Sequence, residues 1–283
     1  MIDFLGARAI RGIEVVDDRR CYRRSIELDG AQGVISVEPD DREMALRVSI
    51  RFPQVSALAG IVRRVRRIFD LSADPLAIRD DLGRDPLLAP LVAKRPGLRV
   101  PGAWDGFEVA VRAILGQQIT VVAAVNLAAK LVAAYGEPLR SVHGDGLTHI
   151  FPTPDRIAQA HLLGMPAARA RALSSVAAAA LANPNLFSPS QTLKDAIAKL
   201  RSIPGIGEWT AQYIALRAMR ETDAFPAADI GLLRGAELLD GARSTVSNLL
   251  MRSESWRPWR AYAAQHLWAA DAATITESRR LYV

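Results

Sequence analysis

The chain has 283 residues, of which 50% are hydrophobic and 23% are charged; this excludes a disordered or low-complexity protein and favours two or three domains. Lys and Arg outnumber Asp and Glu by 36 to 30, and only four of these cations are lysines, a balance that suits a polyanionic partner but that a high-GC genome also produces. Cys21 is the single cysteine, which excludes disulfide frameworks, Cys-ligated zinc and iron–sulfur clusters and indicates a reducing cytoplasm.

The first fifty residues alternate apolar and polar side chains in four segments separated by turn residues. We expect strands at 11–16, 21–28, 33–38 and 43–50, which together predict a small antiparallel sheet. The opening residues mix charges into the apolar positions, so no targeting segment is expected, and no later stretch is apolar enough to span a membrane.

From Gln54 onward the apolar residues recur at helical spacing. The opposite face carries four arginines, Arg63, Arg64, Arg66 and Arg67. A solvated helix face is the favoured interpretation of this cluster, and a phosphate-binding stripe is the alternative.

Prolines punctuate residues 74–100, which predicts short helices and connectors, and the chain beyond Trp104 is almost continuously helical. The expected helices are 104–115, 120–135, 154–161, 167–182, 192–202, 208–220, 230–239 and 258–270. The fold class is therefore α+β, mostly α, with a small antiparallel β-rich N-terminal domain followed by two helical lobes. The expected domains are residues 1–83, residues 84–105 together with 222–283, and residues 106–221, the last carrying a helix–hairpin–helix at 192–220.

A glycine-rich turn, Ile203-Pro204-Gly205-Ile206-Gly207, separates two of these helices. Its two glycines permit a tight turn with positive φ and leave N–H groups pointing outward at the start of the next helix, where they can bind a phosphate without a basic side chain. Ile206 is expected to point inward. With Leu200 before it and Thr210 after it, the string resembles the helix–hairpin–helix motif of DNA-binding proteins, which both enzymes and non-enzymatic modules carry.

A carboxylate, Asp229, follows Trp209 by twenty residues, just before an apolar-periodic helix. Asp is a good N-cap, which is one interpretation of this position. The other is that the helix start keeps the carboxylate ionised in an apolar cleft, where it can stabilise positive charge on a sugar. Asp223 is a nearby rival carboxylate, but it precedes the turn at Phe225-Pro226.

Several strings together resemble the helix–hairpin–helix DNA glycosylase superfamily, and within it most of all the bacterial AlkA-type 3-methyladenine DNA glycosylases, over nearly the whole chain. These strings are FLGARAIRGIE, RPGLRVPGAWDGFEVAVRAILGQQI, LGMPAARARAL, IPGIGEWTAQYIALRA and WRPWRAYAAQHLW. The resemblance implies that Asp229 is the catalytic aspartate, a place that Asp223 does not match, and that a base pocket is lined by Trp209, Tyr213 and Trp268. It also implies DNA contacts at Pro204, Gly205, Ile206, Gly207, Thr210, Gln117 and Gln118. Trp209 and Tyr213 share one helix face, so a packed core stripe is the alternative for these two rings.

In members of this superfamily that also cut the DNA backbone, a lysine stands where this chain has Trp209, and it attacks the sugar as an amine. The resemblance therefore implies a monofunctional glycosylase that flips out alkylated purines of the 3-methyladenine and 7-methylguanine type and leaves an abasic site, with water as the nucleophile. Such bases are cationic leaving groups that need little general acid, and no clear candidate for one stands among His143, His149, His161 and His266. A glycosylase for hypoxanthine or oxidised guanine, or a non-catalytic DNA-binding protein, remains an alternative.

At Gln118 the AlkA type can carry a leucine that fills the space left by the flipped base. Gln118 can fill that space and bond the orphaned base, or it can be a solvated glutamine at a helix start. No cofactor and no side-chain metal site are expected, although the backbone carbonyls of Ile203 and Ile206 are a possible site for Na⁺ or K⁺, as in relatives. The expected partner is double-stranded DNA containing alkylated bases, bound by a cytoplasmic monomer without a membrane partner.

Overall fold

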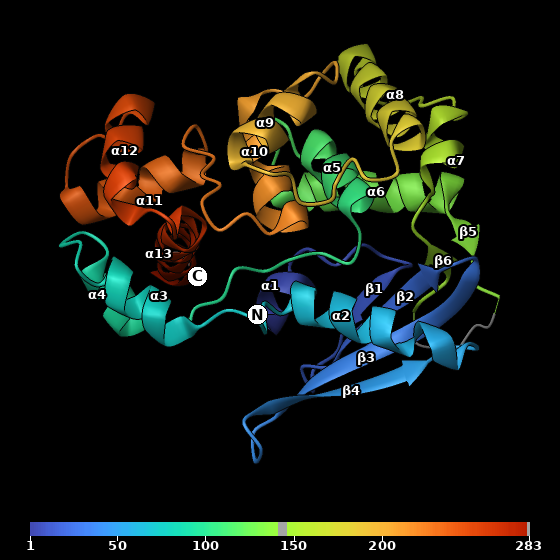
Figure 1. Cartoon of the computed structure of the whole chain (residues 1–283), viewed down its shortest axis with the longest axis horizontal. Helices are drawn as coiled ribbons and strands as arrows, with labels where there is room; N and C mark the ends of the chain where they lie inside the picture. The colour runs from blue at the N-terminus through green and yellow to red at the C-terminus, as the bar shows by residue number, and fades with distance from the viewer. Residues whose placement is uncertain (141–145, 282–283) are drawn as a thin grey trace. The chain divides into compact units, whose positions relative to one another are not determined.

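The computed structural model describes residues 1–140 and 146–281. Figure 1 shows the elements in chain order. The strands are β1 Glu14–Val16, β2 Tyr22–Leu28, β3 Ala31–Asp40, β4 Ala45–Arg51, β5 Glu137–Pro138 and β6 His149–Ile150. The α-helices are α1 Ile2–Gly6, α2 Leu58–Ile68, α3 Pro75–Leu82, α4 Ala89–Lys94, α5 Gly106–Leu115, α6 Val121–Tyr135, α7 Pro154–Ala158, α8 Ala167–Ala182, α9 Leu193–Arg201, α10 Glu208–Ile214, α11 Ile230–Asp240, α12 Val246–Ser253 and α13 Arg260–Leu281. Within the described part of the chain, no helix combines the length and the apolar character that a membrane crossing requires.

The N-terminal sheet is antiparallel with the strand order β1-β2-β3-β4, so the predicted fold class is confirmed. Alternate side chains of β2 and β3 face the core, and Ile26 and Ile35 are almost fully buried there. Gly33 permits the close approach of β4, because a Cβ at this position would lie 2.3 Å from the carbonyl oxygen of Arg51. Helix α2 crosses the sheet in Figure 1, and its Gly60 approaches the side chain of Leu28.

The predicted helices beyond Trp104 are all present, with shifted ends. The largest difference in length is α13, which continues to Leu281 instead of ending near residue 270. The predicted helix 208–220 changes at Ala215–Met219 into a wider π-helical turn, a rare form that occurs frequently at functional sites. The sequence analysis missed α1 and the β5–β6 pair, which are too short to show a clear period. It also missed α12, although Thr245 caps this helix and Val246, Leu249 and Leu250 recur at helical spacing.

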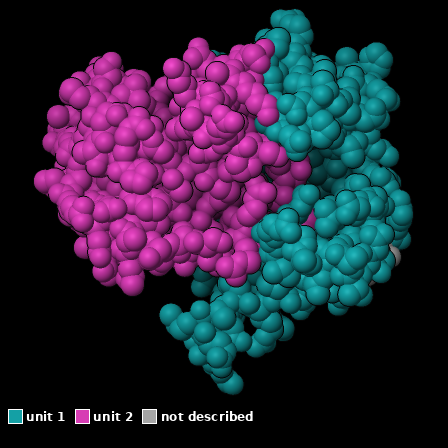
Figure 2. All heavy atoms as spheres, viewed as in Figure 1, with its two compact units in different colours: residues 1–65, 107–186, 203–205 teal, residues 66–106, 187–202, 206–283 magenta. Residues whose placement is uncertain are grey.

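The chain divides into two compact units, which Figure 2 colours separately. Unit 1 comprises residues 1–65, 107–186 and 203–205, so it holds the sheet and α5 to α8. Unit 2 comprises residues 66–106, 187–202 and 206–283, so it holds α3, α4 and α9 to α13. The three-part division expected from the sequence stays a prediction.

A buried ion network ties the sheet of unit 1 to α5. The guanidinium of Arg24 donates to Glu108 at 2.7 Å, and Arg112 donates to the other oxygen of Glu108 at 2.6 Å. Arg112 also pairs with Glu14, which accepts from the hydroxyl of Tyr22 at 2.7 Å. Burial by itself would raise the pKa of Glu108, but the charges of Arg24 and Arg112 outweigh burial and hold that pKa below its ordinary value.

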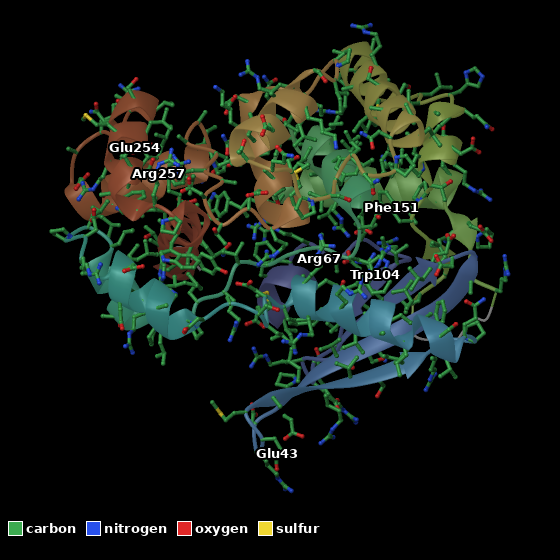
Figure 3. The ribbon with its side chains drawn as sticks, in the orientation of Figure 1. Glu43, Arg67, Trp104, Phe151, Glu254 and Arg257 are labelled. Carbon is green, nitrogen blue, oxygen red and sulfur yellow. The ribbon has the colours of Figure 1, made fainter. Side chains whose placement is uncertain are left out.

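The arginine face of α2 is mostly solvated, as expected. Arg63 and Arg66 are exposed. Arg67, labelled in Figure 3, is exposed as well, and it donates a hydrogen bond to the carbonyl of Ala218 in the π-helical turn. One member of the cluster thus supports that turn.

Candidate active site

The glycine-rich turn connects α9 to α10 as a compact hairpin. Gly205 has φ +90°, and a Cβ there would lie 2.4 Å from the Cβ of Ala172 in α8. Ile206 is 5% exposed, which confirms that it points inward. Gly207, by contrast, has φ −85° and ψ 178° and stands at the N-cap of α10, so the expected positive φ is wrong for this glycine. It begins the helix as extended backbone instead.

The exposed part of the hairpin is largely backbone. Pro204, Gly205 and Gly207 are exposed, and a Cβ at Gly207 would meet no atom of the described residues within 4 Å. Thr210 is only 2% exposed, so its side chain packs inside the protein and does not join this surface. The groups available to a ligand are therefore the backbone amides around the two glycines, at the N-terminus of α10.

Asp229 is the N-cap of α11, and its carboxylate receives four N–H donors. Oδ1 accepts from the backbone of Gly231 at 2.9 Å and Leu232 at 3.2 Å, and from the indole Nε1 of Trp268 at 2.8 Å. Oδ2 accepts from Nε1 of Trp209 at 2.9 Å. Asp229 is therefore an N-cap and, in addition, a half-buried anion held in one orientation between two indoles.

The three predicted aromatic residues come together beside this carboxylate, in unit 2. Trp209 stacks on Tyr213 with ring centroids 5.3 Å apart, and Tyr213 meets Trp268 edge to face at 6.4 Å. All three side chains are half-buried, whereas a packed core stripe would be fully buried. Each of the three side chains therefore remains partly accessible to solvent, as an aromatic pocket requires.

Two residues of α10 and its continuation support this cluster, and the sequence analysis did not identify either. Arg217 is 5% exposed, and its guanidinium carbon lies 5.1 Å from the ring centre of Trp268 and 5.5 Å from that of Tyr213. The side-chain oxygen of Gln212 accepts a hydrogen bond from the backbone of Phe225 at 3.0 Å, which holds the segment leading to Asp229. The helical spacing of residues 209, 213 and 217 was the signal that could have revealed Arg217.

Two glycines of α11 allow α11 and α13 to approach each other closely. At Gly235 a Cβ would lie 2.4 Å from the carbonyl oxygen of Leu267, so only glycine fits this contact. At Gly231 a Cβ would lie 3.0 Å from Oδ1 of Asp229 and 3.1 Å from Cδ1 of Trp268. The helices that carry the carboxylate and its second indole partner are thus fixed against each other.

The rival carboxylate, Asp223, is engaged elsewhere in unit 2. It accepts from Arg260 at 2.7 Å and also pairs with Arg257. Arg257 in turn bonds Glu254 at 2.8 Å, and both are labelled in Figure 3. Two guanidinium groups therefore neutralise Asp223.

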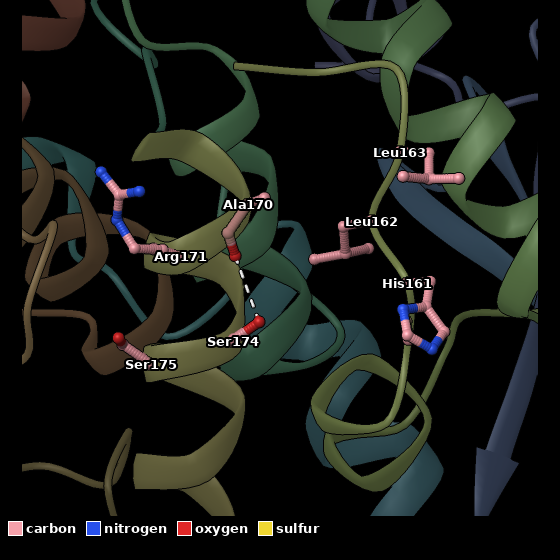
Figure 4. Close-up of a pocket in the computed structure, with 8 residues that line it drawn as sticks. His161, Leu162, Leu163, Ala170, Arg171, Ser174 and Ser175 are labelled. Atoms are coloured by element: carbon pink, nitrogen blue, oxygen red, sulfur yellow. Dashed lines mark hydrogen bonds between the residues drawn. The ribbon is translucent and has the colours of Figure 1, made fainter. Parts of the chain in front are cut away.

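Within the described part of the chain, none of the hydrogen bonds to the carboxylate of Asp229 comes from a histidine. Burial first, and the charge of Arg95 second, lower the pKa of His266 to about 4, so its ring is neutral near pH 7. Nδ1 of His149 lies 2.8 Å from the hydroxyl of Thr148. His161 lines an open pocket of about 410 Å³ in unit 1, shown in Figure 4, whose lining includes none of the predicted site residues. His143 lies outside the described residues.

The loop between α5 and α6 contacts the hairpin within unit 1. The side-chain amide of Gln117 donates to the carbonyl oxygen of Gly205 at 3.3 Å. Gln118, which follows it, is exposed and has φ +59°. The structure therefore brings together two of the segments expected to contact DNA.

Comparison with known proteins finds two family matches. Residues 1–105 match the AlkA N-terminal domain, and residues 111–261 match the HhH-GPD superfamily of base excision DNA repair proteins. The chain is 37% identical over 277 residues to DNA-3-methyladenine glycosylase 2 of Escherichia coli, covering 96% of this chain and 93% of that protein.

A second curated relative is longer. The chain is 40% identical over 268 residues to a probable bifunctional transcriptional activator/DNA repair enzyme AlkA of Mycobacterium tuberculosis, covering 93% of this chain but 53% of that protein. The chain thus spans about half the length of this relative. Among solved structures, a 3-methyladenine DNA-glycosylase from Archaeoglobus fulgidus has the same fold, with a TM-score of 0.80 at 24% identity, covering 92% of this chain and 89% of that one.

Proposed function

This chain belongs to the AlkA family of the HhH-GPD superfamily, and from that premise we propose that it is a monofunctional DNA glycosylase that removes alkylated purines in base excision repair. The observation that carries the proposal is the carboxylate of Asp229, which four N–H donors hold beside three half-buried aromatic side chains. All of these groups come from one chain, so the site is complete in a monomer.

The hairpin binds a backbone phosphate of double-stranded DNA. Its exposed amides at Gly205 and Gly207 stand at the N-terminus of α10, where the helix dipole favours a phosphate. Arginines elsewhere on the surface add diffuse attraction, which strengthens at low salt. DNA binding by this surface needs no basic side chain in the hairpin itself.

The aromatic cluster suits a flipped, N-alkylated purine. A base such as 3-methyladenine or 7-methylguanine carries a positive charge, and the electron-rich faces of Trp209, Tyr213 and Trp268 attract it by about 0.5–2 kcal/mol per contact. Because such a base is a good leaving group, the reaction needs little protonation of the base.

Asp229 acts at the sugar. As the glycosidic bond breaks, positive charge develops on the sugar ring, and an anion held in a fixed direction stabilises that charge and positions the attacking water. Trp209 occupies the place of an amine nucleophile, and its indole nitrogen is a donor to Asp229, so it cannot attack C1′. The product is therefore an abasic site with the DNA backbone intact.

We also propose a monovalent cation at the hairpin. This proposal rests on ligand chemistry, because backbone carbonyl oxygens, here those of Ile203 and Ile206, are hard donors that suit Na⁺ or K⁺. Gly205 turns the chain between them with its positive φ. These residues would hold the ion, and the ion would add positive charge where the hairpin meets a phosphate.

The test is Asp229→Asn, assayed by chromatography of the bases released from methylated duplex DNA. We expect the variant to keep its affinity for duplex DNA containing an abasic-site analogue and to lose at least a hundredfold in single-turnover rate, since the charge that stabilises the sugar is gone. Release at the wild-type rate would refute the role of Asp229. If the wild-type enzyme released hypoxanthine or oxidised guanine but no methylated base, the substrate class would be wrong.

Asp223→Asn is the matched control, because it removes a carboxylate six residues away that is paired with two arginines. It is expected to lower thermal stability and to leave base release by the folded fraction unchanged. The monofunctional claim has a separate test: borohydride added during the reaction should trap no protein–DNA adduct, whereas a trapped adduct would reveal an amine nucleophile.

A further inference from the structure

The segment that would enter the DNA is the loop between α5 and α6, and its backbone is held from outside the loop. The guanidinium of Arg169, on the first turn of α8, donates a 2.8 Å hydrogen bond to the carbonyl oxygen of Gln117. Arg169 is half-buried, so this bond is partly shielded from competition by water. The loop is therefore anchored to α8 at one backbone carbonyl.

That carbonyl belongs to the peptide group between Gln117 and Gln118. The orientation of a peptide plane determines the φ of the residue that follows it, here Gln118, whose φ is +59°. Non-glycine residues adopt this left-handed region uncommonly, and they keep it when their surroundings impose it. The bond from Arg169 is made to the peptide group that precedes this φ angle, and the Gln118 side chain is exposed.

The same face of α8 also positions the hairpin. Ala172 lies one turn after Arg169, and it packs against Gly205 so closely that a Cβ on Gly205 would lie 2.4 Å from the Cβ of Ala172. The loop also contacts the hairpin directly, because the side-chain amide of Gln117 donates to the carbonyl of Gly205 at 3.3 Å. One turn of α8 thus contacts both the loop and the hairpin and fixes the position of one relative to the other.

We propose that Arg169 is the positioning residue for base flipping: it fixes the peptide plane before Gln118, so that the Gln118 side chain enters the duplex at a set distance from the phosphate bound by the hairpin. This inference rests on the proposed glycosylase function. Arg169 contacts neither base nor sugar, and its effect passes through Gln118.

The experiment compares Arg169→Ala with Arg171→Ala in the full-length enzyme. Arg171 is the matched control, because it lies on the same helix, is exposed, and carries the same charge; Figure 4 labels it at the open pocket. Both variants lose one positive charge, so both are expected to bind undamaged duplex about twofold to threefold more weakly. Flipping is followed by the fluorescence of 2-aminopurine beside the target base, and chemistry by single-turnover release of 7-methylguanine.

We expect Arg169→Ala to lower two quantities about tenfold: the equilibrium constant for flipping, obtained from the amplitude of the 2-aminopurine fluorescence, and the single-turnover rate. Arg171→Ala should stay within about twofold of wild type in both. Arg169→Lys should recover part of the loss, because an ammonium also donates to a carbonyl. In a Gln118→Ala background the Arg169→Ala change should cost little more, since its effect is already gone.

Equal behaviour of the two alanine variants, or full additivity with Gln118→Ala, overturns the role of Arg169 and leaves the proposed function intact. A wild-type enzyme that releases no methylated base overturns the proposed function and this role with it.

Discussion

The two hairpin glycines are conformationally unequal, and exchanging each for alanine separates folding from DNA binding. Gly205 lies in the left-handed region, and a Cβ there collides with Ala172. Gly207 has a φ of −85° that alanine adopts freely, and a Cβ there has open space around it. The protein itself therefore requires glycine at position 205, whereas at position 207 the described residues leave room for a methyl group, which a bound partner would meet.

The expected magnitudes follow from these geometries. In Gly205→Ala, the left-handed backbone costs about 1–2 kcal/mol and overpacking against Ala172 about 1–3 kcal/mol, so the free energy of unfolding should fall by roughly 2–5 kcal/mol. In Gly207→Ala, the lower entropy of the unfolded chain stabilises by about 0.4–1 kcal/mol, and the poorer N-cap offsets a similar amount. The net change in stability at Gly207 should stay within about 1 kcal/mol.

The loss of affinity for DNA should be larger in Gly207→Ala than in Gly205→Ala, which is the opposite of the order expected for stability. The methyl of Gly207→Ala stands where a phosphate approaches the backbone amides, and loss of one hydrogen bond to a charged group costs about 1.5–3 kcal/mol, or at least tenfold in Kd. Urea unfolding measures the stability of both variants, and fluorescence anisotropy with a duplex carrying an abasic-site analogue measures affinity. Wild-type affinity in Gly207→Ala, with the protein folded, would refute the assignment of phosphate binding to this amide surface.

Three further outcomes are expected. Glu108→Gln should lower the free energy of unfolding by about 3–5 kcal/mol near pH 7, because the buried guanidinium of Arg24 and the half-buried guanidinium of Arg112 lose their shared anion. Since the pKa of Glu108 is held below its ordinary value of 4.5, its contribution is present above that pH and is lost as pH falls further, so urea titrations of wild type and variant should converge in acid; a constant difference would contradict the pairing. Trp268→Phe keeps an aromatic ring but removes one of the four donors to Asp229, and a roughly tenfold slower single-turnover rate is expected. A faster rate would mean that the indole hydrogen bond reduces the ability of the carboxylate to stabilise positive charge on the sugar. Gly231→Ala should slow base release several-fold with little change in DNA affinity, because its methyl displaces the carboxylate and the indole; unchanged kinetics would show that both tolerate the shift.

Local features of this protein were readable from the sequence because their causes lie within a few neighbouring residues. The alternation that forms the sheet, the helical period and the hairpin string each appear where they were expected. Asp229 was identified as a helix start from its position alone, and it caps α11. Among the elements that were missed, α1 and the β5–β6 pair are too short to show a period, whereas α12 carried a local signal in its Thr245 cap and in the spacing of Val246, Leu249 and Leu250.

The assembly of the site was decided by tertiary packing. Asp229 meets indoles that lie 20 and 39 residues away along the chain, and those contacts depend on how closely α11 approaches α13 at Gly235. Arg217 behind the rings is likewise defined by packing.

The two glycines of the hairpin 203–207 show the same difference between what the sequence determines and what tertiary packing decides. The sequence by itself determined that a glycine-rich turn separates two helices, because glycine's conformational freedom is a property of the residue. Only the tertiary structure decided that Gly205 uses this freedom and Gly207 does not, since a φ angle depends on what packs around the turn, and here Ala172 and the loop held by Arg169 surround Gly205 alone.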